Sequence, residues 1–194
     1  MTRTFIALEM NTALQRHLAG VIRQMAQVFP SIRWVDPAGI HLTLAFLAEL
    51  IDEQLASAQE ATRDAAKQCA SFKYQLSRLG IFGSPRQPRV IWMGIAESSG
   101  MLQHVHQVLS AELQQRGFEV DARPFSPHFT LARVKASLSS EEQAHLRDLL
   151  AGNQESISTT QRFSAEHLVV VKSELLREGA RYSVLNSFNL VLSG

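Results

Sequence analysis

The chain has 194 residues, of which 45% are hydrophobic and 19% charged, and its formal net charge is +1. This composition is typical of an ordinary globular domain with enough apolar side chains to form its own core. It excludes a generally basic nucleic-acid coat, and the single cysteine, Cys69, excludes an internal disulfide.

The first 70 residues predict three strands and two helices. Asn11 can cap the first helix, which ends before Pro30, and Asp52 can cap the second. The sequence between the first helix and the third strand includes turn residues around Pro37. The predicted strands cover residues 4–8, 32–35 and 40–47, and the predicted helices cover residues 11–29 and 52–70.

The rest of the chain continues to mix strands with helices. Ser98 or Ser99 can open a third helix that ends at Gly117, and the capping box Ser139-x-x-Glu142 opens a fourth. The further predicted strands cover residues 72–82, 89–95, 128–133, 168–173 and 182–192. Hairpin-like connections are too frequent for an all-parallel sheet, so the fold class that we expect is α+β with antiparallel sheets.

Two short segments carry the same pattern, a histidine and a threonine two residues apart inside an apolar run. They are His41-Leu-Thr43-Leu-Ala-Phe46 and His128-Phe-Thr130-Leu-Ala-Arg133. On a β-strand, residues i and i+2 share a face, so each copy directs its histidine and threonine one way and the interleaved apolar residues into a core. One such pair alone is more often a core histidine satisfied by a backbone group. Two copies, each followed by Leu-Ala, instead predict a cleft lined by two imidazoles and two hydroxyls.

These residue types suit proton transfer around a phosphate. Histidine has an ordinary pKa near 6.5, so both protonation states exist close to physiological pH. Two histidines across one cleft can therefore serve as a general base and a general acid. Two hydroxyls and two imidazoles that converge on one point suit a phosphodiester, whose charge must be held while one P–O bond forms and another breaks.

Arginine side chains can supply the remaining positive charge, because a guanidinium binds phosphate oxygens through two parallel hydrogen bonds. Arg133 ends the second motif, and Arg86 and Arg89 lie in or beside the loop over residues 83–88. Strict strand alternation, however, points Arg133 away from the cleft, and it does the same to Phe46 in the first copy. Each can face the cleft only if its strand bends. The alternatives are a core position for Phe46 and solvated positions for the arginines.

The sequence gives no sign of a structural metal, a cofactor or a membrane segment. There is no Cys-x-x-Cys and no His-Glu-x-x-His, and the pair His104 and His106 has no carboxylate company. No stretch approaches the roughly 18 consecutive apolar residues that span a bilayer, and the apolar N-terminal stretch is too short for a signal sequence. We therefore expect a cytoplasmic monomer that needs no metal and no cofactor.

Taken together, these residues resemble the two-histidine (2H) phosphoesterases, and within them the RNA 2′,3′-cyclic phosphodiesterases that are also named 2′-5′ RNA ligases. The paired His-x-Thr motifs are the specific element of this resemblance. At Ala48 the sequence departs from the common pattern, in which glycine often follows Phe-Leu. The supporting segments are Phe5-Ile-Ala-Leu8, Gly80 to Trp92, Pro127 to Arg133, and Ser173-Glu-Leu with Gly179 and Tyr182.

The resemblance implies roles for six residues and an architecture. His41 would be the proton donor and His128 the proton acceptor, and the substrate-binding residues would be Thr43, Thr130, Arg133 and Phe46. Residues 1–194 would form a single domain of two pseudo-symmetric lobes, with one motif in each lobe, over residues 41–44 and 128–131. Two related antiparallel β-sheets would face each other across a central cleft, with helices packed outside.

The leading hypothesis is hydrolysis of a terminal 2′,3′-cyclic phosphate on RNA to a 2′-phosphomonoester, without a metal. Its partners would be RNA or oligonucleotide ends that carry this cyclic phosphate. A second hypothesis keeps the cleft but changes the reaction, to a phosphodiesterase acting on another small cyclic phosphate or to 2′-5′ RNA joining. A third hypothesis is a non-catalytic RNA- or nucleotide-binding module, against which the intact histidines of both motifs argue.

Overall fold

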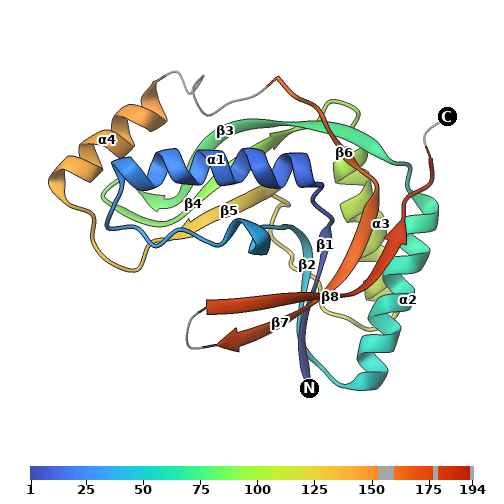
Figure 1. The fold of residues 1–194 in the computed structure, drawn as a ribbon. Helices are drawn as coiled ribbons and strands as arrows, with labels where there is room; N and C mark the ends of the chain where they lie inside the picture. The colour runs from blue at the N-terminus through green and yellow to red at the C-terminus, as the bar shows by residue number, and fades with distance from the viewer. Residues whose placement is uncertain (153–159, 177–178, 193–194) are drawn as a thin grey trace.

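The computed structural model describes residues 1–152, 160–176 and 179–192, which form eight strands and four α-helices (Figure 1). The strands are β1 (Thr2–Leu8), β2 (Leu42–Leu50), β3 (Phe72–Ser84), β4 (Gln87–Ala96), β5 (His128–Arg133), β6 (Phe163–Ala165), β7 (His167–Leu176) and β8 (Gly179–Asn189). The helices are α1 (Thr12–Val28), α2 (Asp52–Gln68), α3 (Met101–Gln115) and α4 (Ser140–Ala151), and Pro37–Gly39 form one 3₁₀ turn, η1.

The strands form two four-stranded sheets. The first sheet has the order β2-β1-β7-β8, and the second has the order β5-β4-β3-β6. Every neighbouring pair of strands in both sheets is antiparallel. These observations confirm the predicted α+β class with two antiparallel sheets. The division into two pseudo-symmetric lobes across a cleft stays a prediction.

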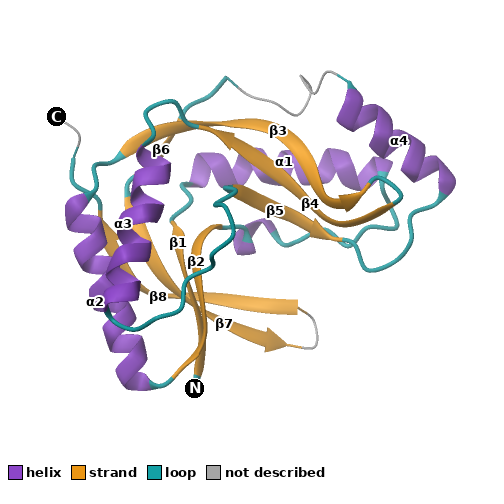
Figure 2. Ribbon diagram, turned by 180° about the vertical axis from the view of Figure 1, so that it is seen from behind, coloured by secondary structure: helices purple, strands orange, loops and turns teal. Residues whose placement is uncertain are grey.

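Helices pack against both sheets. Figure 2 shows α2 and α3 side by side, and α2 also contacts β7 and β8 of the first sheet. Helix α1 runs along the second sheet in Figure 1. Its buried stripe belongs to a cluster that takes in side chains from both sheets, so one continuous core joins them. The buried residues of α1 are Leu14, Leu18, Val21, Ile22 and Met25.

Three of the predicted helix-end signals are confirmed by hydrogen bonds or backbone geometry. The side chain of Asn11 accepts a hydrogen bond from the backbone N–H of Leu14, 2.9 Å away, and caps α1. Ser139 and Glu142 form the capping box of α4 in both directions. Gly117 has a φ of +81°, which suits the residue that follows a helix.

Two predicted helix starts are wrong by one or two residues. Asp52 is the first residue of α2, and Ile51 is the capping residue. The backbone N–H of Ile51 donates a hydrogen bond to the side-chain oxygen of Gln54 at 3.1 Å. Helix α3 begins after Gly100, whose φ is +76°, rather than at a serine. Here the Glu97 carboxylate accepts a hydrogen bond from the N–H of Leu102 at 3.1 Å, and the Ser99 hydroxyl accepts one from the N–H of Met101 at 3.3 Å.

Three other expectations differ from the structure. Residues 32–35 are not a strand, because Trp34 makes only an isolated bridge to Ala132. The expected loop over residues 83–88 is shorter, because strand pairing continues to Ser84 and Gln87 and leaves a two-residue turn. Strand β6, which has only three residues, was missed because so short a run carries no periodic signal.

Candidate active site

His41 lies between η1 and β2, and a backbone carbonyl fixes its ring. The side chain of Asp36 accepts a hydrogen bond from the N–H of Ala38 and caps η1, which sets the direction of the Gly39 carbonyl. The Nδ1 atom of His41 lies 2.8 Å from that carbonyl oxygen. The imidazole also stacks on Phe5, with ring centroids 4.3 Å apart, and meets the edge of Tyr182 at 4.8 Å.

His128 begins β5 and has the same kind of support. Its Nδ1 atom lies 2.7 Å from the carbonyl oxygen of Ser126, again the residue two positions earlier. The ring of Phe82 approaches the imidazole edge-on at 4.9 Å, and the ring of Trp92 lies at 6.1 Å. Each histidine therefore has one backbone hydrogen bond and two aromatic neighbours.

The two hydrogen bonds determine which ring nitrogen can do chemistry. A backbone carbonyl only accepts hydrogen bonds, so Nδ1 of each histidine must carry the proton that it donates. The Nε2 atom then gains or loses the second proton. In both imidazoles of the candidate site, Nε2 is thus the nitrogen that the backbone carbonyl does not engage.

The threonines occupy the positions that strand alternation predicts. Thr43 and Thr130 are half-buried on β2 and β5, while the apolar residues between the motif positions are buried. Trp92 is the cross-strand partner of Thr130, so the threonine and the tryptophan share a face of the second sheet. The buried interleaved residues are Leu42, Leu44, Phe129 and Leu131.

A β-bulge in β5 resolves the difficulty with Arg133. The pairing of β4 with β5 steps from Ile91–Ala132 to Trp92–Thr130, so Leu131 is an extra residue. Leu131 and Ala132 are both buried, and the alternation shifts by one position. Arg133 consequently faces away from the core, on the same side as Thr130.

Two bulges in β2 likewise turn the side chain of Phe46 away from the core. The pairing of β1 with β2 skips Leu44 and again Leu47. The side chain of Phe46 is 65% exposed, so the alternative of a core position is wrong. Its ring lies 5.9 Å from that of Phe5, which itself stacks on His41. Phe46 therefore stands beside the histidine, on the open side of the first sheet.

The two motif strands belong to different sheets but come into contact. Strand β2 contacts β5, and the segment that leads to His41 runs along β5. The backbone N–H of Val35 donates to the carbonyl of Leu131 at 2.9 Å, next to the isolated bridge of Trp34. The hydrogen bond of Val35 therefore fixes the chain to the second motif strand six residues before His41, where the first motif begins.

The electrostatics of His41 connect the two motifs. Burial lowers the pKa of His41 below its ordinary value of 6.5, and the hydrogen bond to the Gly39 carbonyl opposes this effect. The positive charges of Arg133 and His128 lower the pKa of His41 further. Both residues of the second motif are therefore close enough for their charge to reach the first histidine.

The aromatic residues around the histidines were not predicted as site residues. Phe5, Tyr182, Phe82 and Trp92 all lie within the segments that carry the resemblance, which is the signal that could have identified them. Trp92 lies flat against Gly80, where a Cβ atom would come within 2.3 Å of the indole ring. Glycine at position 80 thus makes room for the tryptophan beside His128.

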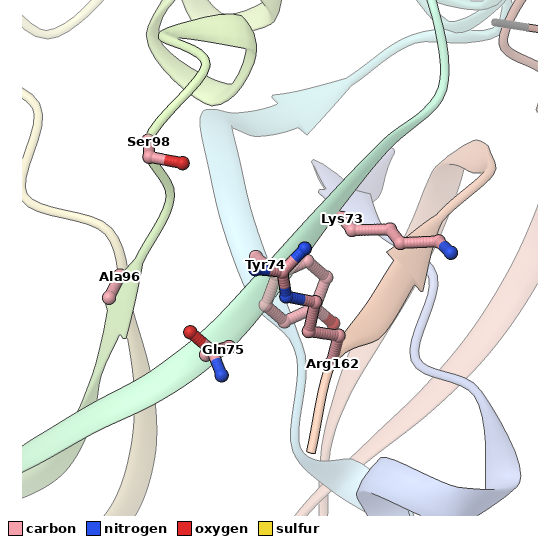
Figure 3. A pocket seen from close by; sticks show the side chains of 6 residues that line it. All are labelled: Lys73, Tyr74, Gln75, Ala96, Ser98 and Arg162. Atoms are coloured by element: carbon pink, nitrogen blue, oxygen red, sulfur yellow. The ribbon is translucent and has the colours of Figure 1, made fainter. Parts of the chain in front are cut away.

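Other predicted or chemically active groups of the described structure lie outside the two motifs. Arg86 and Arg89 are exposed at the β3–β4 turn and on β4. A small hollow of about 50 Å³ lies at the other end of β3, and Figure 3 shows its lining side chains. The hollow is lined by Lys73, Tyr74, Gln75, Ala96, Ser98 and Arg162.

In the described ranges, no three His, Cys, Asp or Glu side chains gather where they could hold a metal ion. None of the helices in these ranges is both long and apolar enough to cross a membrane.

Two imidazoles fixed through Nδ1, two hydroxyls and a guanidinium are the groups of a class of site that can transfer protons around a bound anion. Comparisons with known proteins agree with this class. The family model of the 2′-5′ RNA ligase superfamily matches residues 13–175. The chain belongs to the 2′-5′ RNA ligase superfamily, which confirms the resemblance drawn from the two motifs.

Similar proteins carry a consistent name. The RNA 2′,3′-cyclic phosphodiesterase of Geobacillus stearothermophilus is 29% identical over 187 residues, which are 96% of this chain and 57% of that protein. The RNA 2′,3′-cyclic phosphodiesterase of Methanothermobacter thermautotrophicus is 24% identical over 97% of this chain and 98% of its own length. A crystal structure of a Thermus thermophilus protein superposes with a TM-score of 0.78 at 26% identity and covers 97% of both chains. The assignment to a family of hydrolases is confirmed.

Proposed function

We propose that this chain hydrolyses the terminal 2′,3′-cyclic phosphate of RNA to a 2′-phosphomonoester. The names of the Geobacillus and Methanothermobacter relatives support this substrate class. The observation that carries the proposal is the matched pair of histidines. Each has its Nδ1 atom bonded to a carbonyl two residues earlier, and the charge of His128 lowers the pKa of His41.

In the proposed reaction, His128 is the general base and His41 the general acid. The Nε2 atom of His128 removes a proton from water while the water oxygen bonds to phosphorus. The bond from phosphorus to the ribose 3′-oxygen breaks, and Nε2 of His41 donates its proton to that oxygen. Each role contributes roughly 10²- to 10⁴-fold to the rate. The proton then returns from His128 to His41 through solvent before the next turnover.

The lowered pKa of His41 gives substrate binding a second role. In the free protein, burial, the charge of Arg133 and the charge that His128 carries when it is protonated all disfavour the protonated imidazole that an acid needs. A bound phosphodiester brings a negative charge, and an adjacent negative charge favours imidazolium. Binding of the anion would therefore help to protonate His41 at the stage when its proton is needed.

The remaining residues hold the substrate in this proposal. Thr43 and Thr130 donate hydroxyl hydrogen bonds to the phosphate oxygens, one from each motif strand. Arg133 binds the same phosphate and stabilises the charge that builds up on it as the bond to water forms. The exposed ring of Phe46 offers an apolar surface beside His41 for the nucleoside. We propose that the reaction needs no metal and that the chain acts as a monomer in the cytoplasm.

The test is the turnover of an oligonucleotide with a terminal 2′,3′-cyclic phosphate by His41→Ala and His128→Ala, in EDTA. The wild type should remain active in EDTA, and each variant should lose roughly 10²-fold or more in kcat. His145→Ala is the matched control, because His145 is exposed on α4. Unchanged turnover in either motif variant would contradict the two-histidine mechanism. Loss of wild-type activity in EDTA would contradict its independence of metal, and joined 2′-5′ products would favour the ligase reaction.

A further inference from the structure

Strand β4 carries a bulge next to its turn with β3, and the bulged residue is an arginine. The pairing steps from Phe82–Val90 to Gly83–Pro88, so Arg89 has no direct partner on β3. Pro88 and Ile91 are buried, and between them Arg89 is exposed and Val90 half-buried. A regular strand places one residue between two core positions, whereas here there are two. Arg89 and Val90 therefore both face away from the core.

This bulge places Arg89 next to Arg133. Val90 is the direct cross-strand partner of Arg133, and the carbonyl of Arg89 accepts a hydrogen bond from the N–H of Val134 at 2.9 Å. The two arginines thus lie about one strand spacing apart, roughly 5 to 7 Å between Cα atoms. Both are on the side of the second sheet that carries Thr130. Along this face, the order from the site outward is His128, Thr130, Arg133 and Arg89.

Neither arginine is neutralised within the described part of the chain. No ion pair or side-chain hydrogen bond there engages the guanidinium of Arg89 or of Arg133. Two adjacent guanidinium groups on one sheet face repel each other unless an anion lies between them or on each.

We propose that Arg89 binds the phosphodiester next to the terminal cyclic phosphate, so that the substrate is an oligonucleotide rather than a mononucleotide. This inference rests on the proposed function, which places the cyclic phosphate among His41, His128 and Arg133. The spacing of the two arginines is on the scale of successive phosphates in an extended single strand. The strand then leaves the site along the second sheet towards the β3–β4 turn, where Arg86 is exposed.

The choice of arginine and the position of the bulge support a phosphate ligand over a solvated charge. A guanidinium binds a phosphate through two parallel hydrogen bonds, and the backbone carbonyl of Arg89 is held by the N–H of Val134 at the end of β5. The side chain therefore starts from a fixed point beside Arg133 instead of from a mobile loop. A mononucleotide has no phosphate that could reach Arg89 while its cyclic phosphate contacts the histidines.

The experiment compares Arg89→Gln with the wild type on two substrates, a 2′,3′-cyclic mononucleotide and a tetranucleotide that ends in a 2′,3′-cyclic phosphate. The ratio of kcat/KM on the tetranucleotide to that on the mononucleotide should fall about 3- to 10-fold in the variant. The slope of log kcat/KM against log salt for the tetranucleotide should become shallower by about 0.7, the value for one phosphate contact to a single strand. Arg89→Lys should keep most of the salt slope, because it keeps the charge.

Arg23→Gln is the matched control, since Arg23 is an exposed arginine of α1. Equal losses on both substrates, or an unchanged salt slope, would overturn the proposal.

A binding assay separates this outcome from failure of the proposed reaction. It uses a fluorescent tetranucleotide with a terminal 2′-phosphate and measures anisotropy. One result is that the wild type is inactive on both substrates while Arg89→Gln weakens tetranucleotide binding and makes its dependence on salt shallower. That result would support the contact of Arg89 with phosphate and contradict the proposed reaction. If binding is unchanged, the contact is excluded.

Discussion

His106 stacks face to face on Phe125, with ring centroids 4.0 Å apart and ring planes 8° from parallel. This contact joins α3 to the loop that leads into β5. Phe125 directly precedes Ser126, whose carbonyl holds Nδ1 of His128. Burial lowers the pKa of His106, so burial favours the neutral form of the stacked ring. The stack therefore links a helix outside the site to the orientation of one of its two histidines.

We predict that His106→Ala lowers kcat about 3- to 10-fold with a small change in KM, because the loop that carries the Ser126 carbonyl loses its support. His106→Phe should restore most of the activity, since phenylalanine can stack on Phe125 without an ionisable group. The measurement that separates positioning from simple destabilisation is the NMR signal of the Nδ1 proton of His128. That signal should weaken or shift in His106→Ala and return in His106→Phe. An unchanged signal together with lowered activity would contradict the positioning role.

Ala48 lies in β2 with a φ of +57°, in the left-handed region that favours glycine. The position follows the bulge at Leu47, and it is the one at which the sequence departs from the family pattern. We predict that Ala48→Gly stabilises the protein by about 1 kcal/mol, because it removes the clash of a Cβ atom in this conformation. Urea unfolding measures the change. Ala45→Gly is the control and should destabilise, since Ala45 is in the same strand without a positive φ.

The sequence predicted the elements of this fold better than the faces on which particular side chains lie. Periodicity and capping residues located the four helices, with two starts displaced by one or two residues, because those signals are local. The orientation of Arg133 and Phe46 was not available from alternation, because each depends on a bulge set by pairing with another strand. The same limit applies to Trp92, whose place beside His128 depends on the absence of a side chain at Gly80 on a third strand.

Glu142 is a buried carboxylate that holds α4 to the segment after α1. It is 5% exposed and accepts hydrogen bonds from the hydroxyl of Ser31 at 2.6 Å, from the N–H of Ser31 at 3.1 Å and from the N–H of Ser139 at 2.9 Å. These hydrogen bonds, led by that of the Ser31 hydroxyl, lower the pKa of Glu142 below its ordinary value of 4.5. Ser31 lies three residues before Trp34, which bridges to β5.

We predict that Glu142→Gln destabilises the protein by about 1 to 3 kcal/mol at pH 7, because three donors lose a charged acceptor. The pKa of this carboxyl is lower in the folded than in the unfolded chain. Its contribution is therefore present above pH 4.5 and is lost as the pH falls below it. The difference in unfolding free energy between the wild type and the variant should shrink from pH 7 to pH 3. A difference that is constant with pH would show that the carboxylate charge is not the cause.

The coupling between the motifs gives a prediction for Arg133→Gln that does not depend on turnover. The charge of Arg133 lowers the pKa of His41 in the free protein, so its removal should raise that pKa, while burial and His128 continue to lower it. NMR titration of His41 should show this upward shift, and Arg23→Gln should leave the pKa unchanged.

Arg133→Gln should also alter the unfolding free energy of the protein in acid. Because the pKa of His41 is lower in the folded chain than its unfolded value of 6.5, His41 costs stability as the pH falls below 6.5 and costs nothing well above it. In Arg133→Gln the two pKa values lie closer together, so the loss of unfolding free energy between pH 7.5 and pH 5 should be smaller than in the wild type. A pKa of His41 that stays the same in Arg133→Gln would mean that the arginine does not face the first motif. Arg133 would then have to bind the phosphate of the substrate at a position from which its charge does not reach His41, the proposed general acid.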